Sequence, residues 1–256
     1  MQRKRASRLR KKSENSHMVT NYSVLAKYYD RFTQNDCDYD GWSQYLYGIA
    51  KSHGAKEFVD IACGTGKMTK LMVDKGYKVI GVDASEEMLA VARTKCKAIF
   101  VKQDMRKLDL PHAVDMAICI NDGANYLKGS ELVDFFKAVS RCLKPRAPFV
   151  FDVSSPYKLQ TVVGNNVFYY DSESETLLWS NSASTDSVEM NLTLFVADGK
   201  GKYTRFDEHH VQFVHTDEHI RSALDVAGFD LSQITADYGH AVTDKSLRRC
   251  YYAIKR

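Results

Sequence analysis

Short apolar runs alternate with amphipathic stretches between residues 57 and 153, and this alternation constrains the fold more than any other feature of the sequence. Apolar runs bounded by turn residues predict buried strands, whereas apolar residues spaced three or four apart predict helices. Such an alternation predicts a mostly parallel sheet with right-handed crossovers and helices on both faces. The predicted strands cover residues 57–62, 77–82, 98–102, 114–120 and 148–153, and the predicted helices cover 66–75, 85–95 and 130–143.

The pattern changes near residue 166, because apolar and polar side chains then alternate with a period of two up to about residue 215. This period is typical of strands with one buried face, and Asp198-Gly199-Lys200-Gly201 supplies a turn between two of them. We predict an antiparallel β subdomain of about four strands, residues 166–215, inserted into an α/β domain formed by 18–165 and 216–256. Further helices are predicted at 22–32, 42–51 and 217–227, and further strands at 229–238 and 247–254.

The first seventeen residues differ in composition from the rest of the chain, with seven Lys or Arg among residues 1–12. They are either a disordered basic arm that binds nucleic acid or an anionic membrane, or an expression leader before a start at Met18. Hydrophobic periodicity begins only after Met18, which favours the leader. Without seven bases and Glu14, the net charge changes from +4 to −2, so nucleic acid is an unlikely partner unless the arm is native.

The cysteine pattern and the hydropathy narrow the class of protein further. Six cysteines stand without a CxxC pair or any metal-ligand spacing, so we predict no metal site. No apolar run approaches the roughly 18 residues that a membrane-spanning helix needs, and no secretion signal is present. We therefore expect a cytoplasmic protein, as a monomer or homodimer, that does not enter a membrane.

Polar groups follow three of the predicted strands. The segment Asp60-Ile61-Ala62-Cys63-Gly64-Thr65-Gly66 joins the first strand to the first helix, and its glycines allow a sharp turn and close approach of a ligand. Asp83 ends the second strand, about 20 residues past the glycines, where a carboxylate can accept both hydroxyls of a ribose. Asp104 follows the third strand and can receive an adenine amino group. These strand ends together predict a site for a nucleoside-containing cofactor.

Two details of the glycine segment distinguish S-adenosylmethionine (SAM) from a dinucleotide. A dinucleotide fingerprint requires a third glycine, and Thr69 stands at that position. Asp60, which precedes the glycines, is unfavourable beside a pyrophosphate and favourable near a sulfonium and an amino group. The segment therefore favours SAM.

From about residue 22 to 256 the chain resembles class I SAM-dependent methyltransferases, in particular small bacterial enzymes with a β-rich insertion after the fifth strand. The first glycine of the usual D-x-G-x-G-x-G motif is replaced by Ala62, a mild change at the tightest part of the turn. The resemblance implies a Rossmann-like fold with a mostly parallel seven-stranded sheet, SAM as cofactor and S-adenosylhomocysteine as product. The matching segments are residues 26–30, 60–66, 82–89, 103–105 and 151–153.

The resemblance also implies a role for each matching residue around the cofactor. Asp60 and Gly64 would line its methionine part, with Ala62 and Gly66 in the same turn, and Asn121 would lie near the amino group and the transferred methyl. Tyr22 and Tyr29 would form a lid, a role for which Tyr28 and Trp42 are alternatives if they are not core aromatics. The ribose and adenine would be held by Asp83, Ala84, Met88, Asp104 and the backbone of Met105.

Methyl transfer is an in-line displacement, so a general base is needed only if the acceptor must lose a proton early. Asp122 is our first choice for this base, with Asn121 and Tyr126 beside it in the predicted catalytic site. A histidine on an extended strand more often faces solvent than acts as a base. The other candidates are Asn125, Tyr157, His209, His210 and His215.

The methyl acceptor is the least constrained part of the hypothesis. Asn121-Asp122-Gly123-Ala124 lacks the Pro-Pro-aromatic continuation of base-amino methyltransferases, and the chain has no Pro-Cys, so flipped-base chemistry is not indicated. The insertion is expected to cover the strand ends, which suits an enclosed pocket for a small molecule. We expect a small-molecule acceptor, with an RNA or protein acceptor, or SAM binding without turnover, as alternatives.

Overall fold

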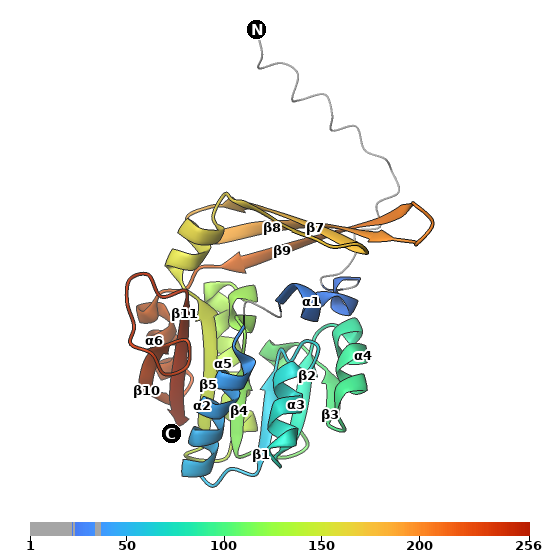
Figure 1. Ribbon diagram of the computed structural model, residues 1–256. Helices are drawn as coiled ribbons and strands as arrows, with labels where there is room; N and C mark the ends of the chain where they lie inside the picture. Colours follow the sequence, from blue (N-terminus) through green and yellow to red (C-terminus); the bar gives the residue numbers. More distant parts are fainter. Residues whose placement is uncertain (1–21, 23, 34–36) are drawn as a thin grey trace.

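The computed structural model describes residues 22, 24–33 and 37–256, which form an α/β layer and a second β layer above it (Figure 1). The α/β layer contains a seven-stranded sheet in the order β10-β11-β5-β4-β1-β2-β3. β11 is antiparallel to both its neighbours, and the other pairs are parallel. The strands are β1 (Glu57–Ile61), β2 (Lys78–Asp83), β3 (Ile99–Lys102), β4 (Met116–Cys119), β5 (Pro148–Ser154), β10 (Phe229–Ala236) and β11 (Arg248–Lys255).

Helices cover both faces of this sheet, as the alternation predicts. Apolar residues of α5 (Leu132–Cys142) and α6 (Asp217–Val226) form one core cluster with the sheet, and those of α2 (Tyr39–Ser52) and α3 (Lys67–Asp74) form another. The central strands are buried on both sides, and all seven positions of β5 are buried. Ser85 begins α4 (Glu86–Lys95) as predicted, because its side chain accepts a hydrogen bond from the Met88 N–H at 3.1 Å.

The second layer is a four-stranded antiparallel sheet in the order β6-β7-β8-β9, so the predicted strand number is correct. Its inward-facing residues Val188 and Met190 pack against a π-helix, Lys158–Val163, while Leu177 and Leu194 pack against Leu25 near the start of the described chain. The sheet thus covers the carboxyl ends of the parallel strands (Figure 1). The strands are β6 (Val167–Asp171), β7 (Glu175–Ala183), β8 (Ser187–Ala197) and β9 (Tyr203–Phe213).

The main error of the secondary-structure prediction concerns the helix expected at 22–32, because the described residues there form two short segments instead of one helix. A 3-10 turn, Leu25–Lys27, is followed by a short helix, α1 (Tyr29–Thr33). The carboxylate of Glu208 on β9 accepts hydrogen bonds from the N–H groups of Val24 and Leu25, so this backbone is oriented by a contact distant in sequence. The predicted leader or basic arm, residues 1–17, lies outside the described residues.

Two short 3-10 segments were not predicted from the sequence. Short 3-10 segments at Met105–Lys107 and Gly123–Tyr126 follow β3 and β4, where turns rather than periodic patterns set the backbone. Among the helices of the described residues, none combines the length and the apolar character required to cross a membrane.

Candidate functional site

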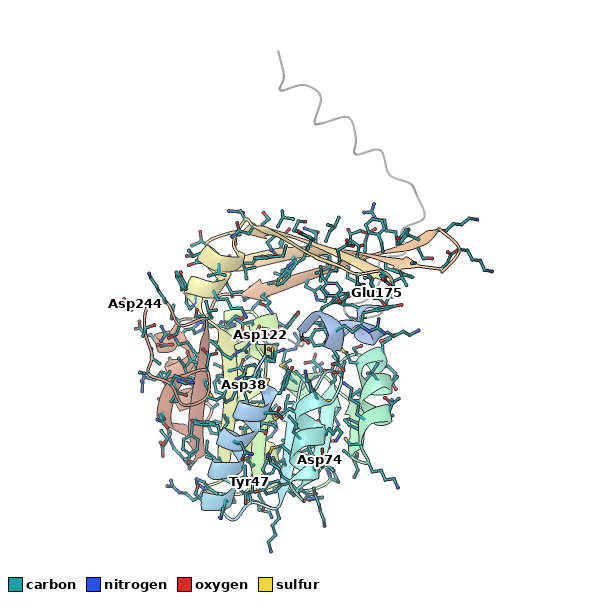
Figure 2. All side chains as sticks on the ribbon, viewed as in Figure 1. Asp38, Tyr47, Asp74, Asp122, Glu175 and Asp244 are labelled. Atoms are coloured by element: carbon teal, nitrogen blue, oxygen red, sulfur yellow. The ribbon has the colours of Figure 1, made fainter. Side chains whose placement is uncertain are left out.

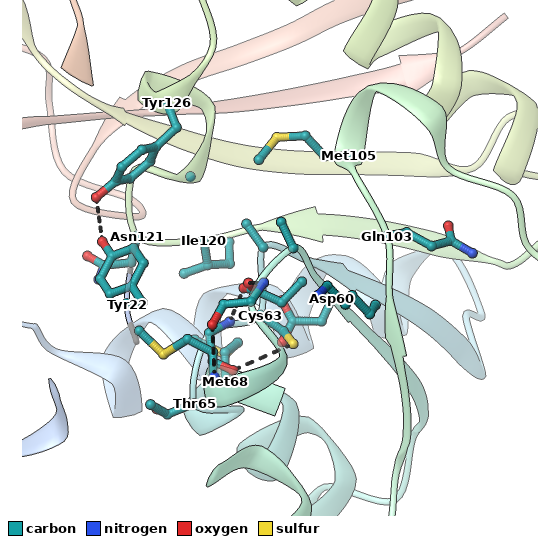
Figure 3. Close-up of a pocket in the computed structure, with 18 of the residues that line it drawn as sticks. Tyr22, Asp60, Cys63, Thr65, Met68, Gln103, Met105, Ile120, Asn121 and Tyr126 are labelled. Atoms are coloured by element: carbon teal, nitrogen blue, oxygen red, sulfur yellow. Dashed lines mark hydrogen bonds between the residues drawn. The ribbon is translucent and has the colours of Figure 1, made fainter. Parts of the chain in front are cut away.

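Two adjoining cavities lie at the carboxyl ends of the parallel strands. The first cavity, about 510 Å³, is lined by the loops that follow β1, β2, β3 and β4. The second cavity, about 440 Å³, lies between the N-terminal segment, the loop after β4 and the four-stranded sheet. Tyr22, Tyr29, Asn121 and Tyr126 line both cavities and form their junction. Figure 3 shows Tyr22, Asn121 and Tyr126 at one end of the first cavity and Gln103 at the other.

The glycine segment turns through three left-handed residues, Ala62 (φ 53°), Gly64 (φ 53°) and Gly66 (φ 72°). Ala62 and Gly64 line the first cavity, and a Cβ added to Gly64 would meet no protein atom within 4 Å. Gly66 does not line either cavity. Its added Cβ would lie 2.8 Å from the Cβ of Ala92, so this glycine permits the close packing of α3 on α4.

Asp60 is a buried carboxyl group at the end of β1 that lines the first cavity. Its Oδ2 accepts a hydrogen bond of 2.5 Å from the Thr69 hydroxyl, and burial raises the pKa of Asp60 to about 7. Within the described part of the chain, no basic side chain forms an ion pair with it. A cationic ligand group at this position would therefore stabilise the ionised form.

Asp83 connects the glycine segment to the loop after β2. Its Oδ2 accepts from the Gly64 N–H and its Oδ1 from the Ser85 N–H, both at 2.8 Å. Burial raises the pKa of Asp83. Each carboxylate oxygen retains a second lone pair, so the group can also receive two ligand hydroxyls. Ala84 and the buried Met88 line the cavity beside it.

Asp104, which follows β3, also lines the first cavity, together with Met105. Its carboxylate forms an ion pair with Arg106 and accepts the Arg106 N–H at 2.9 Å. These hydrogen bonds to Arg106 lower the pKa of Asp104. Asp104 is thus ionised and already engaged, so a ligand amino group would share this carboxylate with a guanidinium.

The loop after β4 contains two successive left-handed residues, Asn121 (φ 67°) and Asp122 (φ 56°). The buried Asp152 carboxylate accepts both of their N–H groups, at 2.7 and 2.6 Å, and pairs with Arg248. Arg248 Nη2 donates to Asn121 Oδ1 at 2.9 Å, while Asn121 Nδ2 donates to the Tyr29 hydroxyl at 3.1 Å. Asp152 and Arg248 therefore fix the backbone and side chain of Asn121, a function that we did not predict for them.

The predicted base, Asp122, lines the second cavity but not the first. Figure 2 shows it at the boundary between the two layers. Its carboxylate accepts a hydrogen bond of 2.7 Å from the Ser154 hydroxyl and lies 3.6 Å from Lys158 Nζ. A hydroxyl and a cation therefore already engage this carboxylate.

Tyr22, Tyr29 and Tyr126 form an aromatic cluster at the junction. The ring centroids of Tyr22 and Tyr29 lie 5.6 Å apart, and the hydroxyls of Tyr22 and Tyr126 form a hydrogen bond. Burial raises the pKa of all three phenols, which keeps them protonated. Of the two alternative lid residues, Tyr28 lines neither cavity, and Trp42 stacks on Tyr238 in the core.

The expectation that histidines of the insertion face solvent holds for His209 and is wrong for His210 and His215. The latter two are buried, with 3% and 1% of their surface exposed. His210 lines the second cavity, whereas Asn125, Tyr157, His209 and His215 line neither one. Side chains alternate between the two faces along β9, and this alternation places His210 on the inner face. The same alternation is present in the sequence, but it indicates an inward His210 only when the register of the strand is known.

The fold and these strand-end groups define an α/β protein with a polar cavity at the carboxyl ends of its parallel strands and a second cavity beside it. A family model described as a methyltransferase domain matches residues 58–146. A Geobacillus protein named "Putative methyltransferase" is 32% identical over 246 residues, covering 92% of this chain and 99% of the relative.

Two solved structures extend this comparison. A SAM-dependent methyltransferase from Clostridium acetobutylicum has a TM-score of 0.83 and 32% identity, covering 92% of this chain and 99% of the other. The sugar N-methyltransferase KedS8 from Streptoalloteichus shares the fold, with a TM-score of 0.74, 21% identity, and coverage of 89% and 92% of the two chains. The protein therefore belongs to the SAM-dependent methyltransferases, and its cofactor is SAM.

Proposed function

We propose that the first cavity binds SAM, that the second cavity binds a small-molecule acceptor, and that the methyl group passes between them at their junction. The observation that carries this proposal is the set of four residues shared by the two cavities, Tyr22, Tyr29, Asn121 and Tyr126. In this proposal residues 18–165 and 216–256 form the SAM-binding domain, and residues 166–215 cover the acceptor.

The residues of the first cavity fit the groups of SAM. Asp60 supplies a buried carboxylate for the amino group, and the open space at Gly64 allows the ligand to approach the backbone. Asp83 receives the ribose hydroxyls with the lone pairs that its two N–H contacts leave. The adenine is placed beside Ala84, Met88 and Met105, with Asp104 accepting from its amino group.

When bound, SAM supplies a methyl group on a positively charged sulfur. The part of the protein is to hold the acceptor in line with that methyl group and to exclude water. Asn121 is suited to positioning because Arg248 and Tyr29 fix both ends of its amide. Tyr22 and Tyr126 close the junction with their hydrogen-bonded hydroxyls.

Size and charge favour a small acceptor. A cavity of about 440 Å³ is within the usual range for small-molecule sites. Each basic residue that lines it faces a carboxylate: Arg31 pairs with Glu175, Lys158 with Asp122 and Arg248 with Asp152. Among the described residues of this wall, a nucleic-acid phosphate would therefore find no uncompensated Lys or Arg.

The test is a labelling experiment with SAM that carries a tritiated methyl group. The full chain and a variant that starts at Met18 are incubated with a small-molecule extract, total RNA and total protein from a bacterial lysate. We expect enzyme-dependent label only in the small-molecule fraction, with Asp83→Ala as the inactive control. Label in RNA or protein would contradict the proposed acceptor class, and SAM binding without label in any fraction would indicate a module without turnover.

A further inference from the structure

Glu208, His210 and Tyr126 form a continuous hydrogen-bonded series at the junction of the two cavities. Glu208 and His210 stand two residues apart on β9, so both side chains are on the inner face of the sheet. His210 Nε2 lies 3.2 Å from Glu208 Oε2, and His210 Nδ1 lies 3.5 Å from the Tyr126 hydroxyl. The Tyr22 ring packs against the imidazole with centroids 4.6 Å apart.

The contacts of Glu208 determine which imidazole nitrogen carries the proton. Its carboxylate also accepts the N–H groups of Tyr22, Val24 and Leu25 at 2.9 to 3.1 Å. Burial opposes ionisation of Glu208, but the hydrogen bonds from His210 and from the backbone outweigh it and lower the pKa. An ionised carboxylate only accepts, so Nε2 of His210 carries the proton and Nδ1 presents a lone pair towards Tyr126.

Neighbouring side chains at the junction are either protonated phenols or already engaged by other partners. The Tyr22 and Tyr126 phenols remain protonated because they are buried. The Asp122 carboxylate is occupied by the Ser154 hydroxyl and faces Lys158. Imidazole is the side chain that exchanges protons most readily near neutral pH, and here a buried carboxylate orients it in the manner of a catalytic triad.

The walls of the second cavity indicate what kind of molecule it accepts. Two aromatic pairs contribute to the lining, Phe32 with Tyr170 at 5.0 Å and Phe168 with Trp179 at 5.1 Å between ring centroids. Aromatic faces favour contact with flat, weakly polar rings. The cations in the lining are already compensated by carboxylates, which disfavours an anionic acceptor.

We infer that the acceptor is a flat, uncharged ring compound with a hydroxyl or amino group, and that His210 receives the proton which this group loses. The inference rests on the proposed function, because it takes the second cavity as the acceptor site. A lone pair of the acceptor oxygen or nitrogen forms the bond to the methyl carbon as the carbon–sulfur bond breaks and its electrons stay on sulfur. The acceptor proton passes to Nδ1 of His210, directly or through the Tyr126 hydroxyl, and Glu208 stabilises the imidazolium.

4-Nitrophenol is a suitable probe, because it is a flat phenol whose ionised form absorbs visible light. The protein is saturated with S-adenosylhomocysteine and titrated with the probe in a buffer slightly more acidic than the pKa of the free phenol. We expect the wild-type protein to bind the probe with a phenolate-to-phenol ratio about tenfold above that in buffer, since His210 takes up its proton. His210→Gln should bind the probe and lose this excess.

His209→Gln is the matched control, because His209 is the exposed neighbour on the outer face of the same strand and should leave the excess unchanged. An excess retained in His210→Gln, or lost in Asp122→Asn, would overturn the role of His210 while leaving the acceptor cavity intact. Failure of the wild-type protein to bind the probe would instead contradict the proposed acceptor site and, with it, the substrate class. Equal S-adenosylhomocysteine affinity in all variants shows that each one is folded.

Discussion

The two cavities differ in how their walls are assembled. In the first cavity the main hydrogen bonds join residues that are close in the sequence. Asp83 accepts the Gly64 N–H over a separation of 19 residues, and Asp60 accepts the Thr69 hydroxyl over a separation of 9. At the second cavity, Tyr22 forms hydrogen bonds with Tyr126 and Glu208, which are 104 and 186 residues away in the sequence. The cofactor side is therefore fixed by strand-end motifs, whereas the acceptor side exists only after the N-terminal segment and the inserted sheet have packed together.

The largest expected effect is on the cofactor side. Asp83→Ala removes the proposed ribose ligand and the acceptor for two N–H groups of the surrounding loops. Charge-assisted hydrogen bonds of this kind contribute about 1.5–3 kcal/mol each, so SAM affinity should fall by at least about 100-fold in calorimetric titrations. Asp74→Ala, at the opposite end of the sheet in Figure 2, should leave the affinity unchanged. Unchanged affinity in Asp83→Ala would remove Asp83 from the site.

The second prediction concerns pH. Burial raises the pKa of Asp60 to about 7, and a proton must leave before the carboxylate can hold the SAM amino group. SAM affinity should therefore fall by up to about tenfold for each pH unit below 7. Asp60→Asn should bind SAM weakly, with a flatter pH profile in calorimetry. Repulsion from the Asp83 carboxylate also acts on Asp60, and Asp83 is present in both proteins. A pH dependence that persists in Asp60→Asn therefore belongs to Asp83.

The buried Asp60 carboxyl group should also lower the free energy of unfolding at high pH. A folded-state pKa above the unfolded value stabilises the fold at low pH, and this contribution is lost as the pH rises through about 7. Asp60→Asn without SAM should therefore be more stable than the wild-type protein at pH 8, by about 1 kcal/mol or more in urea unfolding, with a smaller difference at pH 5. A less stable variant at pH 8 would show that other interactions of the ionised Asp60 carboxylate outweigh the cost of burying it.

A smaller effect on SAM is expected from the acceptor side. Glu208→Gln weakens the attachment of the N-terminal segment to β9 and should lower the free energy of unfolding by about 1–3 kcal/mol in urea. SAM affinity should change by no more than about threefold. Asp207→Asn, whose exposed side chain pairs with Arg205, is the control and should be nearly neutral. A loss of SAM affinity as large as that in Asp83→Ala would show that the two cavities are one functional unit.

The smallest predicted effect concerns the residue that replaces the first motif glycine. Ala62 has a left-handed backbone, which costs an alanine about 1–2 kcal/mol. Ala62→Gly relieves this strain but makes the unfolded chain more flexible. The net gain should be about 0.5–1 kcal/mol in thermal or urea unfolding, with SAM affinity retained. A loss of stability would mean that the alanine methyl contributes more by packing than it costs in strain.

The contrast between the two sides also explains what the sequence could predict. The alternation of strands and helices and the four-stranded antiparallel sheet followed from periodicity, and Asp60, Asp83 and Asp104 could be located because a parallel sheet brings its strand ends together. Gly66 matched the motif, but its close contact with Ala92 could be found only from the three-dimensional structure.

On the acceptor side, the sequence pointed to Asp122 and placed histidines in solvent. The inward orientation of His210 depends on the register of β9, and a register shift of one residue would have exposed it. The single predicted helix at residues 22–32 failed for a similar reason, because Glu208, far along the chain, fixes that backbone. Asp152 and Arg248 lie on adjacent strands, and their pairing beneath Asn121 required the three-dimensional arrangement.

Calorimetric titration of the full chain with SAM and with S-adenosylhomocysteine is the decisive test of whether the first cavity holds SAM. We expect one binding site with a dissociation constant in the micromolar range for both ligands, and a large loss of affinity in Asp83→Ala. Absence of binding by folded wild-type protein would mean that the glycine segment and its carboxylates serve the structure alone, and would contradict the proposed site.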